Sequence, residues 1–360
     1  MRDRRMDVRY GVATGDASPV AAHRRSGRSR RPLAVLVAAL LCGSLATAPG
    51  QAQARAAVRT APAGAAGSHG WAGSKVLPSL RQNLVAYYDF EHPVPGNPAQ
   101  ERDRGFSGTN INLVNGGASM RVRDGAYPGS TYSIQTKQVN PTIAGNDDWK
   151  AGVYSETGVS TLHAFNGVKG ASIMGWFKMT GPNPNLNSNT SDPADYYNAV
   201  GLAGVLSGTS QGHDVRALLE VISVSGELRV VALGRRVDGS SSQTFAANDN
   251  WQSVLPLNTW VFLAATFDFD DATMKLYKNG RPLDGSYVLP GDPWAVSGPP
   301  EPDVTSATDP RGIKIGGSFP QNTKEANPCN CRLDSLMFLN RVVTPWEVGQ
   351  QYRRAMTRRH

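Results

Sequence analysis

Short apolar runs recur along the chain after residue 80, separated by polar segments rich in Gly, Pro, Asn and Asp. Runs of this length with such boundaries predict β-strands. The clearest are residues 84–90, 173–179, 218–224, 228–233, 260–267, 274–278, 313–317 and 331–338. Asn279-Gly280 follows one of them and predicts a two-residue hairpin, because both residues accept positive φ. The pattern therefore predicts a domain built mainly from antiparallel strands.

One helix is predicted, close to the C-terminus. Thr344 suits the N-cap position, Pro345 the first helical position, and Glu347 the third, which together make a capping box. We expect this helix to end near Ala355. Many short strands, Gly- and Pro-rich turns and one terminal helix are typical of an all-β, two-sheet antiparallel jelly-roll sandwich, although periodicity does not fix the strand order.

The first 54 residues have the pattern of a signal peptide. Five arginines between residues 24 and 31 precede an apolar run at 33–48, and Ala52-Gln53-Ala54 offers small residues to signal peptidase. The alternative is a membrane anchor, but the run is shorter than the roughly 20 residues that span a bilayer. We therefore expect a secreted, extracellular protein that has no membrane attachment after cleavage.

The remaining chain is predicted to form one domain. Residues 55–79 are rich in Ala, Gly, Pro and Ser and predict a linker, residues 80–355 the sandwich, and residues 356–360 a tail. The formal net charge is +8, but residues 1–54 hold nine Arg against three Asp. The rest holds 28 Lys and Arg against 26 Asp and Glu. We therefore expect no nucleic-acid partner, and we expect a monomer.

Several motifs occur in the order found in one family. They are residues 84–91, 107–110, 173–177, 258–267, 276–280, 315–317, 333–336 and 344–348. Together they resemble the laminin-G-like branch of the concanavalin A-like lectin and glucanase superfamily. The resemblance covers nearly the whole folded region and implies a jelly roll, but this fold serves many activities and selects none of them.

The resemblance also implies a structural Ca²⁺. In similar domains an acidic residue after the first strand and an Asp of a late strand help to hold the ion, and Glu91 and Asp334 stand at these positions. Phe106 departs from the family, which has an Asp or another polar residue there. The alternative is that both acids are solvated or pair with Arg332 or Arg341.

Two cysteines, Cys329 and Cys331, remain after signal cleavage. An oxidising compartment favours a disulfide between them, although a single intervening residue makes a tight ring. The alternatives are two free thiols or half of a metal site. No CxxC or HxxxH motif supplies further zinc ligands.

Five aromatic residues lie in polar segments between the predicted strands: Trp149, Tyr196, Tyr197, Trp251 and Trp294. Exposed aromatic rings can stack on the C–H faces of sugars, and loops often carry binding residues. The alternative is that these rings fill small apolar clusters beneath the loops.

Catalytic motifs are weak in this sequence. Residues 208–212 match GxSxG, but they join two strand-like segments and lack the strand-elbow-helix context that this motif needs. We therefore predict a secreted, lectin-like carbohydrate-binding module with a glycan partner and no catalysis. The alternatives are a polysaccharide lyase or glycoside hydrolase on the same fold, and an extracellular adhesion or protein-binding domain.

Overall fold

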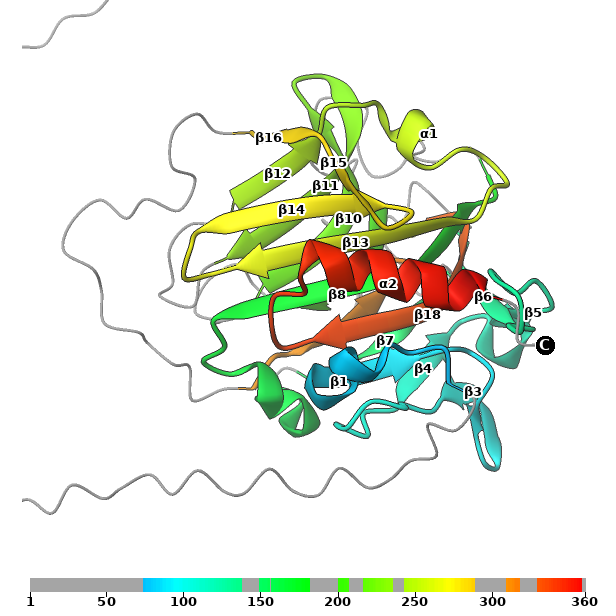
Figure 1. Cartoon of the computed structure of the whole chain (residues 1–360). Coiled ribbons are helices and arrows are strands. Elements are labelled where there is room, and N and C mark those ends of the chain that lie inside the picture. The colour runs from blue at the N-terminus through cyan, green and yellow to red at the C-terminus, as the bar shows by residue number, and fades with distance from the viewer. Residues whose placement is uncertain are drawn as a thin grey trace, which may run out of the picture. The chain divides into compact units, whose positions relative to one another are not determined.

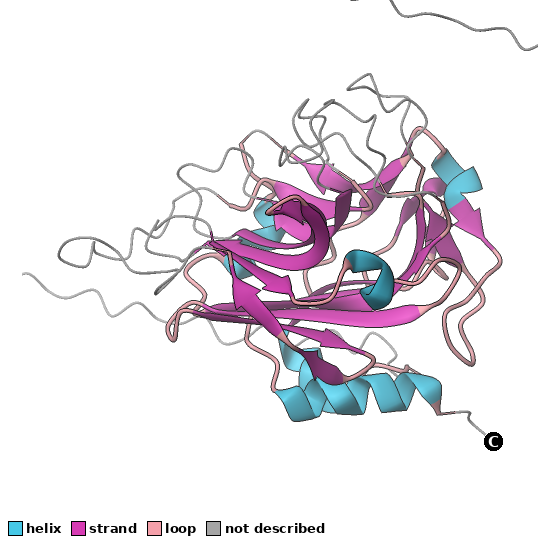
Figure 2. Cartoon of the chain, turned by 90° about the horizontal axis from the view of Figure 1, so that it is seen from above, coloured by secondary structure: helices cyan, strands magenta, loops and turns pink. Residues whose placement is uncertain are grey.

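Two antiparallel sheets, of eight and ten strands, form a β-sandwich (Figures 1 and 2). The computed structural model describes residues 74–137, 149–155, 157–181, 200–206, 216–235, 243–288, 309–317 and 329–357. The prediction of an all-β, two-sheet antiparallel sandwich with a short C-terminal helix is confirmed.

The eight-stranded sheet joins the first and last strands of the domain. Its order is β15-β14-β13-β8-β18-β6-β5, with β1 also paired to β18. The strands are β1 (Leu84–Tyr88), β5 (Arg121–Val122), β6 (Ser133–Gln135), β8 (Gly170–Met179), β13 (Val261–Asp268), β14 (Thr273–Lys278), β15 (Arg281–Leu283) and β18 (Cys331–Leu339). In the β1–β18 pair, Tyr88 lies opposite Leu336.

The ten-stranded sheet has the order β16-β12-β11-β10-β9-β17-β7-β4-β3-β2. Its strands are β2 (Pro93–Val94), β3 (Asn97–Glu101), β4 (Ile111–Val114), β7 (Lys150–Tyr154), β9 (Val200–Leu206), β10 (Arg216–Val224), β11 (Glu227–Arg235), β12 (Gln243–Ala247), β16 (Gly285–Tyr287) and β17 (Gly312–Ile315). Strands β10 and β11 form the hairpin predicted around Ser225-Gly226.

The predicted Asn279-Gly280 turn joins β14 to β15. The two residues have φ values of +50° and +79°, as a type I′ turn requires. A Cβ on Gly280 would lie 3.1 Å from the Gly349 Cα and the Tyr352 Cβ, both in the terminal helix. The glycine therefore serves the turn and the close approach of the helix together.

The main core lies between the sheets. Phe177 and Phe267 of the smaller sheet pack with Leu202 and Ile313 of the larger one, and all four are buried. Successive strand residues face opposite sides of a sheet. Trp176, the neighbour of Phe177, therefore belongs to a second apolar cluster on the outer face of the smaller sheet.

Helix α2 (Pro345–Met356) covers this second cluster, lying across the smaller sheet in Figure 1. Val348 and Ala355 are buried in the cluster, and the Tyr352 ring lies 5.7 Å from that of Trp176. Packing against the sheet, rather than helix propensity alone, therefore fixes α2.

The shorter helices are η1 (Pro78–Asn83), η2 (Gly117–Met120), η3 (Ser160–Phe165) and α1 (Trp251–Val254).

The predicted capping box at the start of α2 is confirmed. The Glu347 N–H donates to Thr344 Oγ1 at 3.2 Å, and the Thr344 N–H donates to Glu347 Oε2 at 3.1 Å. Arg341 donates to both carboxylate oxygens at 2.9 and 2.7 Å, and Ser79 donates to one at 2.7 Å. These hydrogen bonds, those from Arg341 above all, lower the pKa of Glu347 to about 2. Glu347 thereby ties the helix to both ends of the domain.

A buried ion pair lies on the face of the larger sheet that is turned away from the core. Lys314 of β17 contacts Glu220 of β10, and their side chains are 2% and 5% exposed. Ile313 and Ile315 face the core, so Lys314 faces the other way. A Cβ on Gly201 of the intervening β9 would lie 2.5 Å from Lys314 Cε. The missing side chain therefore leaves the lysine room to cross that strand.

We expect Glu347→Gln to remove one source of acid sensitivity. Because the folded-state pKa of Glu347 lies below its unfolded value of 4.5, its stabilisation is present above about pH 4.5 and is lost as the pH falls toward about 2. Urea unfolding across this range should show the wild-type free energy of unfolding approaching that of the variant. Glu227→Gln, at a side chain 66% exposed, is the control. A wild-type advantage that stays constant down to about pH 2 would contradict this role.

We expect Lys314→Met to lower the free energy of unfolding by about 3–5 kcal/mol, because the change leaves Glu220 buried without its cation. The double variant Lys314→Met/Glu220→Met should recover most of this loss. Chemical denaturation measures both, with Lys275→Met at an exposed position of β14 as the control. A single-variant loss no larger than that of the control would show that the pair is not effectively buried.

Candidate cation and glycan sites

Glu91 and Asp334, the predicted calcium ligands, lie on either side of Ser130. Ser130 Oγ donates to Asp334 Oδ2 at 2.6 Å and lies 3.4 Å from Glu91 Oε1. Glu91 follows β1 and Asp334 belongs to β18, so the pairing of these two strands brings the carboxylates together. One hydroxyl therefore links acidic residues from opposite ends of the domain.

The Glu91 carboxylate is held by backbone donors. Its Oε1 accepts hydrogen bonds from the N–H groups of Thr131 at 2.5 Å and Tyr132 at 2.8 Å. These donors come from the segment between β5 and β6. A cation that binds Glu91 must therefore use its second oxygen or compete with these N–H groups.

Asp334 is fully buried and has three donors. Besides Ser130, the N–H of Ala126 donates at 3.0 Å and the hydroxyl of Ser335 at 2.9 Å. Burial nevertheless raises the pKa of Asp334 to about 7. A nearby cation would stabilise the charged carboxylate and oppose this effect.

Neither arginine considered as an alternative partner is bound to these acids. Arg332 instead contacts Asp124, and Arg341 contacts Glu347.

A second group of possible metal ligands lies nearby in the chain. Ligand atoms of Asp89, His92 and Glu101 all lie within 4.8 Å of one another. Asp89 accepts from Arg104 at 3.1 Å and lies 2.7 Å from His92, while buried Glu101 pairs with Arg121 at 2.6 Å. The guanidinium groups supply the positive charge that a metal would bring. The sequence analysis missed this group, because only the hairpin of β2 and β3 brings Glu101 back to His92.

Two of the five predicted sugar-stacking residues are described, and both pack on the main core. Trp149 and Trp251 are partly buried, and Lys137 Nζ lies 3.9 Å from the centre of the Trp149 ring. These contacts favour the alternative hypothesis for these two residues, in which the rings fill apolar clusters beneath loops. Outside the described residues lie Tyr196, Tyr197 and Trp294, as do residues 208–212.

An aromatic ring on α2 is more exposed than either. Trp346 is 62% exposed, the most among the large apolar side chains that the structure describes. With the Gln350 amide oriented to satisfy its neighbours, its oxygen accepts from Trp346 Nε1 at 3.3 Å and from Arg353 at 2.8 Å. Steps of four and three residues place these side chains on one face of the helix. Trp346 was not singled out from the sequence, where it lies within the motif at residues 344–348.

A pocket of about 290 Å³ adjoins this face of the helix. It is lined by Lys75, Leu77, Gln350, Arg353, Arg354 and Thr357. Lys75 Nζ contacts the carbonyl of Thr357, and Arg354 donates to the carbonyl of Ser74 at 3.3 Å. The pocket thus joins residues that precede β1 to the end of α2, and its lining in the described part of the chain has three cationic side chains and no acidic one.

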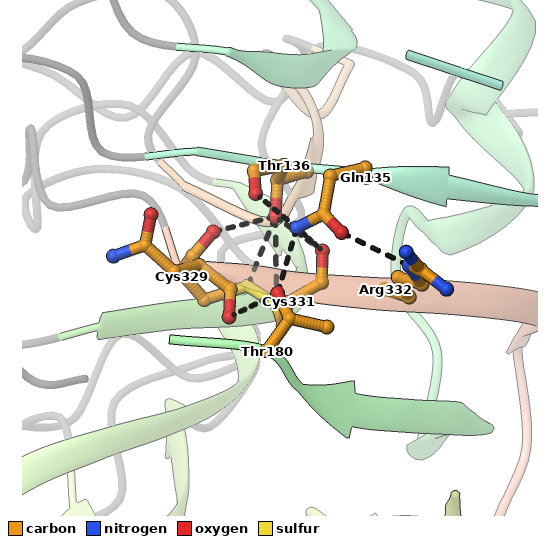
Figure 3. Close-up of a disulfide and its surroundings, with 7 residues drawn as sticks. Gln135, Thr136, Thr180, Cys329, Cys331 and Arg332 are labelled. Atoms are coloured by element: carbon orange, nitrogen blue, oxygen red, sulfur yellow. Dashed lines mark hydrogen bonds between the residues drawn. A yellow bond between two sulfur atoms is a disulfide. The ribbon is translucent and has the colours of Figure 1, made fainter. Parts of the chain in front are cut away.

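Cys331 begins β18 and Cys329 lies two residues before it; both are buried, with adjacent sulfur atoms and Cα atoms 5.2 Å apart (Figure 3). Thr136 Oγ1 donates to the Cys329 carbonyl at 2.6 Å, and Gln135 Nε2 donates to the Cys331 carbonyl at 3.1 Å. These bonds hold the backbone on both sides of the pair against β6.

Comparison with known proteins gives similarity to solved structures alone. No protein-family model matches the chain, and no curated protein matches it. Among the described residues, no helix is long and apolar enough to cross a membrane.

Three solved structures illustrate the similarity. One comes from work on the cell entry of botulinum neurotoxin type C, which is dependent upon interaction with two ganglioside molecules. It has 10% identity and a TM-score of 0.46, over 78% of this chain and 53% of that one. The botulinum neurotoxin type G receptor-binding domain has 11% identity and a TM-score of 0.42, over 75% and 51%. Trypanosoma rangeli sialidase has 12% identity and a TM-score of 0.42, over 75% and 32%. This chain thus spans from a third to about half of each, and likenesses this distant carry no argument about its function.

Proposed function

We propose that this protein is a secreted, lectin-like module of the laminin-G-like type that binds a glycan through the exposed face of α2. The observation that carries the proposal is Trp346, an aromatic ring 62% exposed on a helix that packs against the sheet. A sugar offers C–H groups to such a ring and hydroxyl groups to the Gln350 amide and the Arg353 guanidinium. All three side chains lie on one face of the helix.

The rigidity of α2 supports this proposal. Leu77 N–H donates to Gln351 Oε1 at 2.8 Å, which joins the helix to the segment before β1. Together with the capping box and the buried Val348 and Ala355, this contact fixes the backbone beneath Trp346. A site held in this way loses less conformational entropy on binding than a site on a mobile loop.

Export and oxidation form part of the same proposal. A signal at residues 1–54 would deliver the domain to an oxidising compartment, where a disulfide between Cys329 and Cys331 is favoured. The Cα separation of 5.2 Å lies within the range found for disulfides.

We also propose a structural Ca²⁺ held by Glu91 and Asp334. Hard oxygen ligands from both ends of the domain meet at Ser130, and buried Asp334 gains from a nearby cation. The N–H donors on Glu91 compete with the ion. We therefore expect weak binding, in the range of about 10⁻⁴–10⁻³ M found for extracellular modules.

We expect Trp346→Ala to weaken binding to the polysaccharide that the wild type binds by about 10- to 100-fold, or about 1.4–2.8 kcal/mol. The midpoint of unfolding should stay unchanged. Co-sedimentation with a panel of insoluble polysaccharides identifies the polymer, and titration with its soluble fragments gives the affinity. Met356→Ala, at a side chain 43% exposed on the same helix, should bind like the wild type. Undiminished binding by Trp346→Ala would move the site elsewhere, and released sugar would indicate an enzyme.

Adding Ca²⁺ at about tenfold above its dissociation constant should stabilise the protein by about 1.4 kcal/mol. Thermal unfolding in Ca²⁺, Mg²⁺ or EDTA tests this expectation, and calorimetric titration gives the affinity. Glu91→Gln should abolish the Ca²⁺ effect, whereas Glu227→Gln should retain it. A wild-type protein that shows neither binding heat nor a shift would mean that the hydrogen bonds of Ser130 join the two acids without an ion.

A further inference from the structure

The pocket beside Trp346 concentrates positive charge on a domain that is otherwise close to neutral. Lys75, Arg353 and Arg354 line it. The pKa of Arg81 is lowered, first because burial disfavours its charged form and second because the positive charge of Arg354 lies nearby. Residues 55–360 hold 28 basic and 26 acidic side chains, so this cluster is a local feature rather than a reflection of net charge.

We propose that this pocket binds the carboxylate or sulfate groups of an acidic polysaccharide, so that the module selects anionic glycans over neutral ones. This inference rests on the proposed glycan site, since the pocket and Trp346 belong to the same helix face. Arg353 connects them, because it lines the pocket and also donates to the Gln350 oxygen that Trp346 shares.

Helix capping does not account for the whole cluster. The C-terminal end of a helix carries partial negative charge and attracts cations, and Lys75 satisfies it by contacting the Thr357 carbonyl. Arg354 Nε, however, is buried and has no hydrogen-bond partner among the described residues. Glu347, the acidic residue of α2, is bound to Arg341 at the opposite end of the helix. The cationic groups of the pocket therefore favour an anionic ligand.

The dimensions suit a polymer rather than a small ion. Arg353 lies seven positions after Trp346 in the sequence, which is about 10 Å along a helix axis. A chain that stacks one ring on Trp346 can therefore place an acidic group of a different sugar unit in the pocket. Its affinity should fall as salt screens the charges, while the contact with Trp346 remains.

Matched polymers test this inference with the full mature chain. Binding is measured by calorimetric titration against dextran and dextran sulfate, and against polygalacturonate and its methyl ester. We expect the wild type to bind each charged polymer at least about tenfold more tightly than its neutral partner, about 1.4 kcal/mol. Arg353→Gln and, separately, Lys75→Gln should reduce this margin, and Arg281→Gln, at an exposed position of β15, should keep it.

The outcomes separate the two proposals. Equal wild-type affinity for charged and neutral polymers would overturn the selection of anions and leave glycan binding intact. A charged-polymer preference that persists in both pocket variants would also overturn it. A wild-type protein that binds none of the four polymers would reject both proposals. Tighter binding to phosphatidylserine vesicles than to the polymers would identify a lipid surface instead and overturn the inference.

Discussion

The pairing of β1 with β18 is the contact on which the rest of the domain depends. It places the first strand beside the last, so that Glu91 meets Asp334 across Ser130. The same pairing brings the segment before β1 against the helix that follows β18, where Leu77 bonds to Gln351. The candidate calcium site and the cationic pocket beside α2 are therefore both built from the two ends of the domain.

Local rules explain the features that the sequence predicted well. The Asn279-Gly280 turn, the capping box at Thr344 and the longer apolar strands depend on residues within a few positions of one another, and all three are confirmed. The strand Asn97–Glu101 escaped prediction, because three of its five residues are polar and Glu101 alone among them is buried. The order of strands depends on long-range pairing and had no local signal.

The candidate site shows the same limit. The resemblance pointed to Glu91 and Asp334, but the hydroxyl of Ser130 that joins them belongs to neither motif. Spacing within α2 could have placed Trp346 and Arg353 on one face, but their exposure depends on which face the sheet covers. No sequence pattern places Lys75 in the pocket, because it lies far from Thr357 along the chain and contacts it only in the folded protein.

The Lys314–Glu220 pair also bears on how the strands of the larger sheet find their alignment. Lys314 reaches Glu220 across β9 beside Gly201, which leaves space for its side chain. A slip of β17 by one residue would turn the lysine into the apolar core and an isoleucine outward. The pair thus fixes the register of β17. A misaligned sheet would bury the lysine without its partner, so its free energy would be much higher.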